Sequence, residues 1–346
     1  MEKSHKALEL RICYFISSYR SPEQLCRLVK TLQLGDPGSS IVIHHDLFQF
    51  PLDPSLFKGE PDVHVLTSDH PMIWGDMSLE AVRWRVFRWI LKNLNVDWVM
   101  LLSEQDYPIT PLQTLRSRLT GSDVDAIIDG ERIDETLDKR RLHESTIRYM
   151  YQYKSLPFLK IEQRLPKWWR VIMRKSRSYF YTAVDRSQEK VFIYQFAAEL
   201  MLPSRIGFRP AKNPFSVDYP CWRHRPWYAL SRSAMEHVIK YLDSHPDFVS
   251  YYSRTVIPLE SATGTIVFND PELKVENIGL HAIVWSNPDS GRPDVIGLDD
   301  LEFLRNSGAV FARKFDHSSA EVLSEIDKMV FPPSRSSNSE GPKTPS

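Results

Sequence analysis

Cysteine, long apolar runs and an excess of charge of one sign are scarce or missing in this chain of 346 residues. Its three cysteines, Cys13, Cys26 and Cys221, are too few and too scattered for a disulfide framework or a CxxC metal site, which favours a reducing compartment. Free cysteines of this kind usually pack as small core residues. With 44 basic and 44 acidic side chains the formal net charge is +0, so nucleic acid is not expected as a partner.

No stretch offers the ~20 uninterrupted apolar residues that a membrane span needs, and the charged start of the chain does not fit a signal peptide or an anchor. We therefore expect a soluble, cytoplasmic protein. Trp168 and Trp169, with the basic residues around them, would still allow peripheral contact with a membrane. The Ser- and Pro-rich end, residues 334–346, predicts a disordered tail.

The chain does contain the alternation of an α/β protein, with 42% hydrophobic residues to supply a sizeable core. Between residues 12 and 129, short apolar runs alternate with stretches of helical periodicity, which predicts a mostly parallel central sheet flanked by crossover helices. The predicted strands are Ile12–Ile16, Ile41–His45, Val63–Leu66, Trp98–Leu102 and Asp125–Ile128.

Two crossover helices are predicted from their end signals and apolar faces. The first is capped by Ser21, has Pro22 in its first turn and continues to Leu32. The second begins at Ser78 and runs to Leu94. Farther along, the pattern predicts a strand over Trp227–Ser231 and helices over Ser233–Leu242 and from Leu298 to about Asn306.

Residues 132–215 depart from this order. They are rich in Arg, Lys, Tyr and Trp and lack clear periodicity, which indicates an irregular insertion with one or two helices. Long irregular segments inside a domain are often functional. We therefore predict a single domain over residues 10–318 that carries this insertion.

The predicted strand over Trp98–Leu102 is followed by two acidic side chains, Glu104 and Asp106. Open α/β sheets bind ligands just beyond the carboxyl ends of such strands. These acids could hold a divalent cation that bridges a diphosphate, or accept hydrogen bonds from vicinal sugar hydroxyls without a metal. Asp123-Val-Asp125 is a literal Asp-x-Asp, but it precedes an apolar run and is better explained as a polar loop.

His44-His45-Asp46 closes the second predicted strand. A carboxylate at this place can accept hydrogen bonds from a uracil N–H or a ribose hydroxyl. A turn-capping Asp beside partly buried histidines is the alternative. A zinc site is a weaker explanation, because adjacent strand residues point to opposite faces.

Two later segments carry further candidates. Glu260 follows Pro258 at the opening of an apolar helical run, so it either favours the positive end of a helix or, if it lines a cleft, acts as a general base on an acceptor hydroxyl. Arg313 and Lys314 lie between two phenylalanines. Such a pair is either a solvated surface or a clamp for a diphosphate.

Six segments, taken in order, carry a family resemblance. They are His44–Asp46, Trp74–Leu79, Asp97–Ile109, Trp227–Ser231 with Glu236–Val238, Pro258–Ser261 and Phe311–Asp316. Together they resemble the core-2/I-branching β-1,6-N-acetylglucosaminyltransferase and peptide O-xylosyltransferase family, glycosyltransferase family 14. Each segment is weak alone, but the ordered set is specific and spans about residues 12–316.

The resemblance implies a GT-A-like nucleotide-diphospho-sugar transferase fold and inverting transfer from a UDP-sugar to a hydroxyl of a glycan or other acceptor, with no metal and no other cofactor. Residue matching implies that Glu260 is the catalytic base and that Asp46 contacts uridine. It also implies that Arg313 and Lys314 bind the diphosphate. Arg292 lies close to a further phosphate-binding arginine of the family.

Four residues are expected to contact the donor sugar or the acceptor: Trp74, Glu104, Asp106 and Trp227. Glu104 departs from the family, whose Ser/Cys-Gly-x-Asp turn has no acid there. The family's Golgi anchor and luminal cysteines are also missing, which is typical of a soluble, bacterial relative. N-acetylglucosamine or xylose is the expected sugar, while the acceptor and the oligomeric state stay open.

Two alternatives remain. One is a metal-dependent GT-A glycosyltransferase in which Glu104 and Asp106 hold Mn²⁺ or Mg²⁺. The other is a non-catalytic carbohydrate- or nucleotide-binding relative that has kept the fold.

Overall fold

The computed structural model describes residues 10–60, 62–120, 122–155, 191–194, 205–210, 212–287 and 292–332. It divides into two compact units, which are treated separately below. Unit 1 comprises Met1–Arg20, Ser40–Leu102 and Asp123–Leu280, and unit 2 comprises Ser21–Ser39, Ser103–Ser122 and His281–Ser346. The predicted tail and the pair Trp168 and Trp169 lie outside the described residues. The single domain over residues 10–318 stays a prediction.

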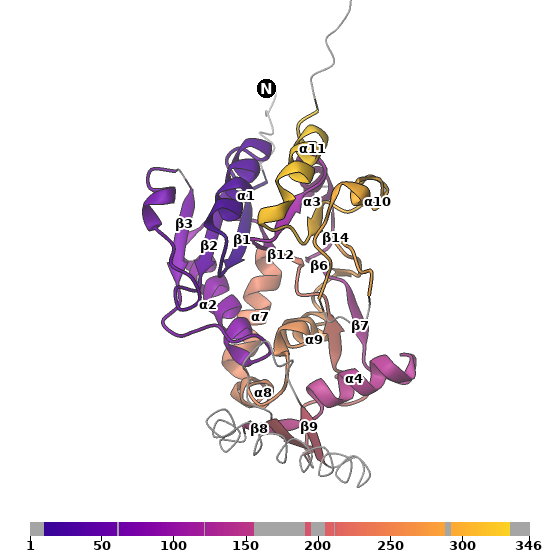
Figure 1. The fold of residues 1–346 in the computed structure, drawn as a ribbon. Coiled ribbons are helices and arrows are strands. Elements are labelled where there is room, and N and C mark those ends of the chain that lie inside the picture. Colours follow the sequence, from indigo (N-terminus) through magenta and orange to yellow (C-terminus); the bar gives the residue numbers. More distant parts are fainter. Residues whose placement is uncertain are drawn as a thin grey trace, which may run out of the picture. The chain divides into compact units, whose positions relative to one another are not determined.

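Unit 1 is built on a seven-stranded sheet in the order β13-β6-β12-β4-β1-β2-β3 (Figure 1). The strands are β1 (Ile12–Ser18), β2 (Ser40–His45), β3 (Val63–Thr67), β4 (Trp98–Ser103), β6 (Ala126–Ile127), β12 (Ala229–Ser231) and β13 (Val275–Glu276). Strands β1, β2 and β3 pair in parallel, whereas β12 lies between β4 and β6 and is antiparallel to both. The predicted α/β fold with a mostly parallel central sheet is confirmed, and β12 makes the sheet mixed.

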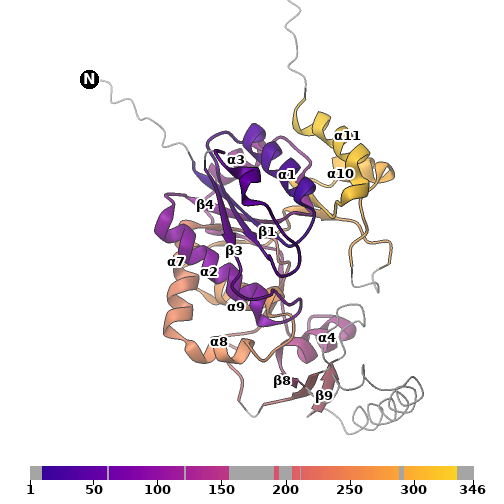
Figure 2. The same ribbon diagram turned by 60° about the vertical axis from the view of Figure 1, so that its left-hand side comes forward.

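The core of unit 1 lies between one face of this sheet and four helices (Figure 1, Figure 2). The helices are α2 (Met77–Asn93), α7 (Arg232–Ser244), α8 (Pro246–Tyr252) and α9 (Ala262–Asn269). Alternate residues of β1 and β4, such as Phe15 and Leu101, face this core, as the two-residue period of a strand requires. Helix α2 begins at Met77 instead of the predicted Ser78, because the carboxylate of Asp76 caps it by accepting from the Ser78 N–H (2.6 Å).

The described part of the predicted insertion is more regular than its sequence pattern indicates. It contains α4 (Lys139–Tyr149) and an antiparallel sheet formed by β8 (Gln152–Ser155), β10 (Arg205–Phe208) and β9 (Val191–Tyr194). Strands β7 (Gly130–Arg132) and β11 (Trp222–His224) pair separately. One or two helices were predicted, but strands this short show no clear alternation, so periodicity could not identify them. Unit 1 also contains the 3-10 helices η1 (Pro54–Phe57) and η3 (Pro258–Glu260).

Unit 2 contains a three-stranded sheet, β14-β15-β5, and several helices. Its elements are α1 (Pro22–Gly35), β5 (Asp106–Pro108), α3 (Gln113–Thr120), β14 (His281–Ile283), η5 (Leu298–Asp300), α10 (Leu301–Asn306), β15 (Phe311–Arg313), η6 (His317–Ser319) and α11 (Ala320–Val330). The buried hydroxyl of Tyr107 ties three of them together, with Thr31 Oγ1 at 2.6 Å and Asp327 Oδ1 at 2.7 Å. The predicted cap at Ser21 is wrong, because Ser21 is left-handed (φ 52°) and its side chain makes no cap hydrogen bond.

Cys13 and Cys221 are buried as predicted, whereas Cys26 is half-buried, and all three thiols are free. None of the helices that the structure describes combines the length and the hydropathy that crossing a bilayer requires.

Candidate active site

The Glu260 turn connects α8 and α9 in unit 1. Ile257 adopts a left-handed backbone conformation (φ 55°, ψ 50°), and Pro258 then opens η3. The Glu260 N–H donates to the Ile257 carbonyl at 3.1 Å. A β-branched residue in this conformation is a backbone outlier, which persists only where the surroundings hold it, and such strain clusters at functional sites. The backbone alone therefore makes this turn a candidate site.

The carboxylate of Glu260 is partly open to solvent. Its side chain is 30% exposed, and Oε2 accepts a hydrogen bond from Nη1 of Arg148 at 3.1 Å. Arg148 lies in the last turn of α4 and also pairs with Glu144, one turn earlier. An accessible carboxylate with one oxygen held in this way is suited to take a proton from a hydroxyl group.

A buried ion pair on α2 supports the same turn. Arg83 donates to the carbonyl of Leu259 at 3.5 Å and lies 3.6 Å from Oε2 of the fully buried Glu80. Glu80 also accepts a hydrogen bond from the hydroxyl of Thr263 in α9. Burial raises the pKa of Glu80, and Arg83 and Thr263 oppose that rise. Helix α2 therefore holds both the residue before Glu260 and the helix after it.

The loop that carries Trp74 is joined to the Glu260 turn. The Ile257 N–H donates to the Gly75 carbonyl at 2.9 Å, and Gly75 has φ 83°, which favours glycine. Trp74 itself is 42% exposed. The structure thus brings together two predicted site segments that are far apart in the sequence. Trp227 precedes β12 and is half-buried.

Asp46 follows β2 and is fully buried. Its carboxylate accepts hydrogen bonds from the N–H groups of Phe48 (3.0 Å) and Met72 (2.8 Å) and from the Gln49 side-chain amide (2.9 Å). These bonds brace the loops after β2 and β3, as expected of a turn-capping Asp. Contact between Asp46 and uridine stays a prediction.

Asp106 and Arg313 form a buried ion pair in unit 2. Strands β5 and β15 place the two residues opposite each other, with Arg313 Nη1 at 2.8 Å from Asp106 Oδ1. The Ser103 N–H donates to Oδ2 at 2.7 Å, and His281 Nε2 lies 3.6 Å from the same oxygen. Burial raises the pKa of Asp106, but Arg313 and His281, with the Ser103 N–H, outweigh it and hold that pKa below its ordinary value. Both carboxylate oxygens are thus engaged within the protein, and sugar contact by Asp106 stays a prediction.

The other predicted residues of unit 2 differ in exposure. Glu104 is fully buried in the turn between β4 and β5. Lys314 follows β15 and is half-buried, and Arg292 is exposed. In the predicted basic pair, Arg313 is therefore bound to an acid, whereas Lys314 is more accessible to solvent.

Among the residues that the structure describes, no group of three or more His, Cys, Asp and Glu side chains could hold a metal ion. His44 and His45, the last two residues of β2, contact protein groups instead: His44 Nε2 lies 2.9 Å from Arg85 Nη2, and His45 Nδ1 lies 2.9 Å from Ser18 Oγ. Burial, then Arg85, lowers the pKa of His44 to about 4.

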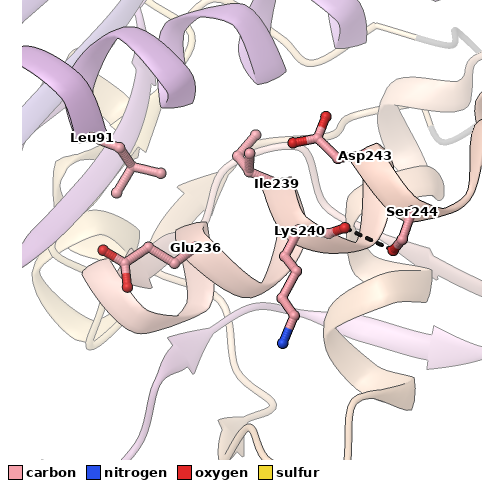
Figure 3. Close-up of a pocket in the computed structure, with 6 residues that line it drawn as sticks. All are labelled: Leu91, Glu236, Ile239, Lys240, Asp243 and Ser244. Atoms are coloured by element: carbon pink, nitrogen blue, oxygen red, sulfur yellow. Dashed lines mark hydrogen bonds between the residues drawn. The ribbon is translucent and has the colours of Figure 1, made fainter.

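An open depression of about 500 Å³ lies against α2 and α7, and Figure 3 shows the six residues that line it. Its lining residues are Leu91, Glu236, Ile239, Lys240, Asp243 and Ser244. Four of these six residues are polar or charged, and none of them is a predicted site residue. This depression is therefore separate from the candidate active site.

Sequence reasoning missed Arg148 and Glu144, which lie in the segment predicted to be irregular. The available signal was their spacing, because an acid and a base four residues apart form a favourable pair on a helix. The contact between Arg148 and Glu260 cannot be predicted from the local sequence pattern, because the two residues are 112 positions apart.

Comparison with known proteins provides independent information. The family model described as Core-2/I-Branching enzyme matches residues 12–194, which are 183 of the 346 residues and more than half of the chain. The beta-glucuronosyltransferase GlcAT14B of Arabidopsis thaliana is 26% identical over 330 residues, covering 92% of this chain and 65% of that protein. GlcAT14A of the same plant is 36% identical over 104 residues, covering 29% of this chain and 23% of that protein. The chain thus spans less than two thirds of the length of these curated relatives.

Among solved structures, the galactosyltransferase LgtC in complex with donor and acceptor sugar analogues is 14% identical, with a TM-score of 0.26. The match covers 40% of this chain and 51% of that one. A likeness this low supports no argument about function.

Proposed function

Because the chain belongs to the Core-2/I-Branching enzyme family, we propose that it is a glycosyltransferase that moves a sugar from a UDP-sugar to a hydroxyl group of a glycan or another acceptor. The observation that carries the proposal is the accessible carboxylate of Glu260, held through Oε2 on a strained turn in contact with the Trp74 loop. That arrangement supplies what an inverting transfer needs from a general base.

The proposed reaction is a single displacement at the anomeric carbon. The acceptor oxygen forms the new bond to that carbon as the bond from the carbon to the diphosphate oxygen breaks. Glu260 takes the acceptor proton, and UDP leaves with the bonding electron pair. Attack from the opposite side inverts the anomeric configuration, so a UDP-sugar whose diphosphate is α-linked gives a β-linked product.

The charge that develops on the leaving diphosphate needs cations that are already in place. Arg313 and Lys314 are assigned this role, with Arg292 as a further candidate, and Asp46 is assigned to uridine. In this proposal Asp106 acts on Arg313: the ion pair fixes the direction of the guanidinium before a donor arrives.

The donor sugar is proposed from the relatives. Both curated relatives are named as beta-glucuronosyltransferases, which supports UDP-glucuronic acid as a candidate beside UDP-N-acetylglucosamine and UDP-xylose. A panel of these three compounds, tested for thermal stabilisation and for hydrolysis, ranks them, because a bound donor raises apparent stability by mass action.

The Glu260→Gln variant tests the base. It is expected to bind UDP as the unaltered protein does and to lose turnover by about 10²–10⁴-fold, since the amide cannot accept the proton. Glu272→Gln is the matched control, because that side chain is 76% exposed and lies outside the turn. UDP-sugar consumption at the unaltered rate by Glu260→Gln would overturn the assignment. If no UDP-sugar binds or reacts at all, a non-catalytic relative is the better explanation.

Metal independence is tested by chelation. In this proposal activity survives EDTA, because both oxygens of Asp106 are engaged by protein donors and the leaving group is stabilised by side-chain cations. Complete loss of activity that Mn²⁺ restores would instead favour the metal-dependent alternative with Glu104 and Asp106.

A further inference from the structure

Arg148 holds the candidate base from both its side chain and its main chain. Its Nη1 donates to Glu260 Oε2 at 3.1 Å, and its carbonyl accepts the Val256 N–H at 3.0 Å. Val256 precedes the strained Ile257 that opens the turn. One residue of α4 therefore fixes both the carboxylate and the backbone segment that leads to it.

Glu144 limits the freedom of the guanidinium. It lies one helical turn before Arg148 and pairs with Nη2, while Glu260 takes Nη1. The Arg148 side chain is only 18% exposed, so water does not compete freely for its donors. The next residue, Tyr149, is buried, and its carbonyl accepts a hydrogen bond from the Tyr251 hydroxyl at 2.9 Å. This hydrogen bond attaches the C-terminal end of α4 to α8.

The arrangement distinguishes the two oxygens of Glu260. Oε2 is engaged by Arg148, whereas among the described residues no hydrogen bond reaches Oε1. A carboxylate without this contact would rotate, and either oxygen would face the acceptor only part of the time. Misplacement of a reacting group by about 1 Å can reduce a rate about 10²-fold.

We propose that Arg148, held in turn by Glu144, is a positioning residue that fixes the Glu260 carboxylate so that Oε1 faces the acceptor hydroxyl. The inference rests on the proposed function, because it needs Glu260 to be the base. Arg148 touches neither the donor nor the acceptor in this role and acts only through Glu260.

The test compares variants on one helix. Arg148→Gln is expected to lower kcat for hydrolysis of the UDP-sugar selected by the donor panel by about 10- to 100-fold. KM for that UDP-sugar and the affinity for UDP stay within about threefold, because the contact is not part of donor binding. Arg148→Lys retains the positive charge but places it on one nitrogen instead of a planar guanidinium. It should therefore have a higher kcat than Arg148→Gln but a lower kcat than the unaltered protein. Arg141→Gln is the matched control: Arg141 also lies on α4 and pairs with Glu131 and Asp138, but its side chain is 53% exposed.

A double variant separates positioning from general damage. If Arg148 acts through Glu260, Arg148→Gln combined with Glu260→Gln should turn over no more slowly than Glu260→Gln alone. Thermal unfolding and UDP binding of each variant report on folding. If Arg148→Gln is unfolded, Glu144→Gln takes its place, with an expected loss of kcat of about 3- to 10-fold, since it frees the guanidinium without removing it.

The outcomes distinguish the two proposals. An inactive Glu260→Gln variant with an Arg148→Gln variant that keeps the unaltered kcat overturns the positioning role alone. Additive losses in the double variant, or equal losses in Arg148→Gln and Arg141→Gln, overturn it as well. A fully active Glu260→Gln variant overturns the base itself, and with it both proposals.

Discussion

Replacing Asp106 by Asn is expected to destabilise the folded protein by about 3–5 kcal/mol, the usual cost of removing one partner from a buried ion pair. Asp106 is fully buried, and the Arg313 side chain is only 10% exposed, with 2.8 Å between Nη1 and Oδ1. An amide of the same shape keeps the packing but leaves the charge of Arg313 without a counter-charge. Because the site is buried, water cannot solvate that charge in place of the carboxylate.

The pH dependence of this effect has a definite sign. Arg313 and His281 hold the folded-state pKa of Asp106 below its ordinary value of 3.8, against the effect of burial. The ionised carboxylate therefore contributes stability that is fully present above about pH 3.8 and is lost as the pH falls through the folded-state value. The difference in unfolding free energy between the Asp106→Asn variant and the unaltered protein should therefore become smaller only in that acidic range.

Urea unfolding at neutral pH measures the loss. Asp243→Asn is the control, because the Arg88–Asp243 pair is just as close (2.6 Å) but its side chains are 45% and 60% exposed, so a far smaller change is expected. A double-mutant cycle of Asp106→Asn with Arg313→Gln should give a coupling energy of about 1–3 kcal/mol. Equal losses in Asp106→Asn and Asp243→Asn, or additive effects in the cycle, would refute the reasoning.

Two further predictions concern unit 1. Gly264→Ala should cost about 1–3 kcal/mol of stability in urea unfolding, because its Cβ would clash with Cδ2 of the buried His224. Gly279→Ala, whose new Cβ would have its nearest atom at 3.6 Å, should be close to neutral. An equal effect of the two alanines would contradict this. The pKa of His44 is lowered to about 4 by burial and Arg85, so the unfolded chain takes up a proton first and the unfolding free energy should fall as the pH drops from about 6.5 to about 4. His44→Asn should make the unfolding free energy depend less steeply on pH in this range. If the plots of unfolding free energy against pH for the variant and the unaltered protein stay parallel, His44 is not the group responsible.

The sequence by itself determined the long strands and the principal helices. Strands β1, β2 and β4 are short, continuous apolar runs ended by polar residues, and such runs are typical of interior strands that are buried on both faces. The start of α1 was readable from Pro22, whose ring presets the helical φ angle. The sequence also singled out Glu260, Asp106 and Arg313, because carboxylates and cations next to apolar runs stand out in a local pattern.

Only the tertiary structure decided which of these groups meet. Strand β12 is three residues long, and its place between β4 and β6 follows from pairing partners far away in the chain. Asp106 and Arg313 are 207 residues apart, and Arg148 and Glu260 are 112 apart. Periodicity and capping rules act over a few residues, so they determine where an element begins and what type it is. The partners of a buried charge depend on which elements pack together, and that is settled by burial and hydrogen bonding across the whole fold.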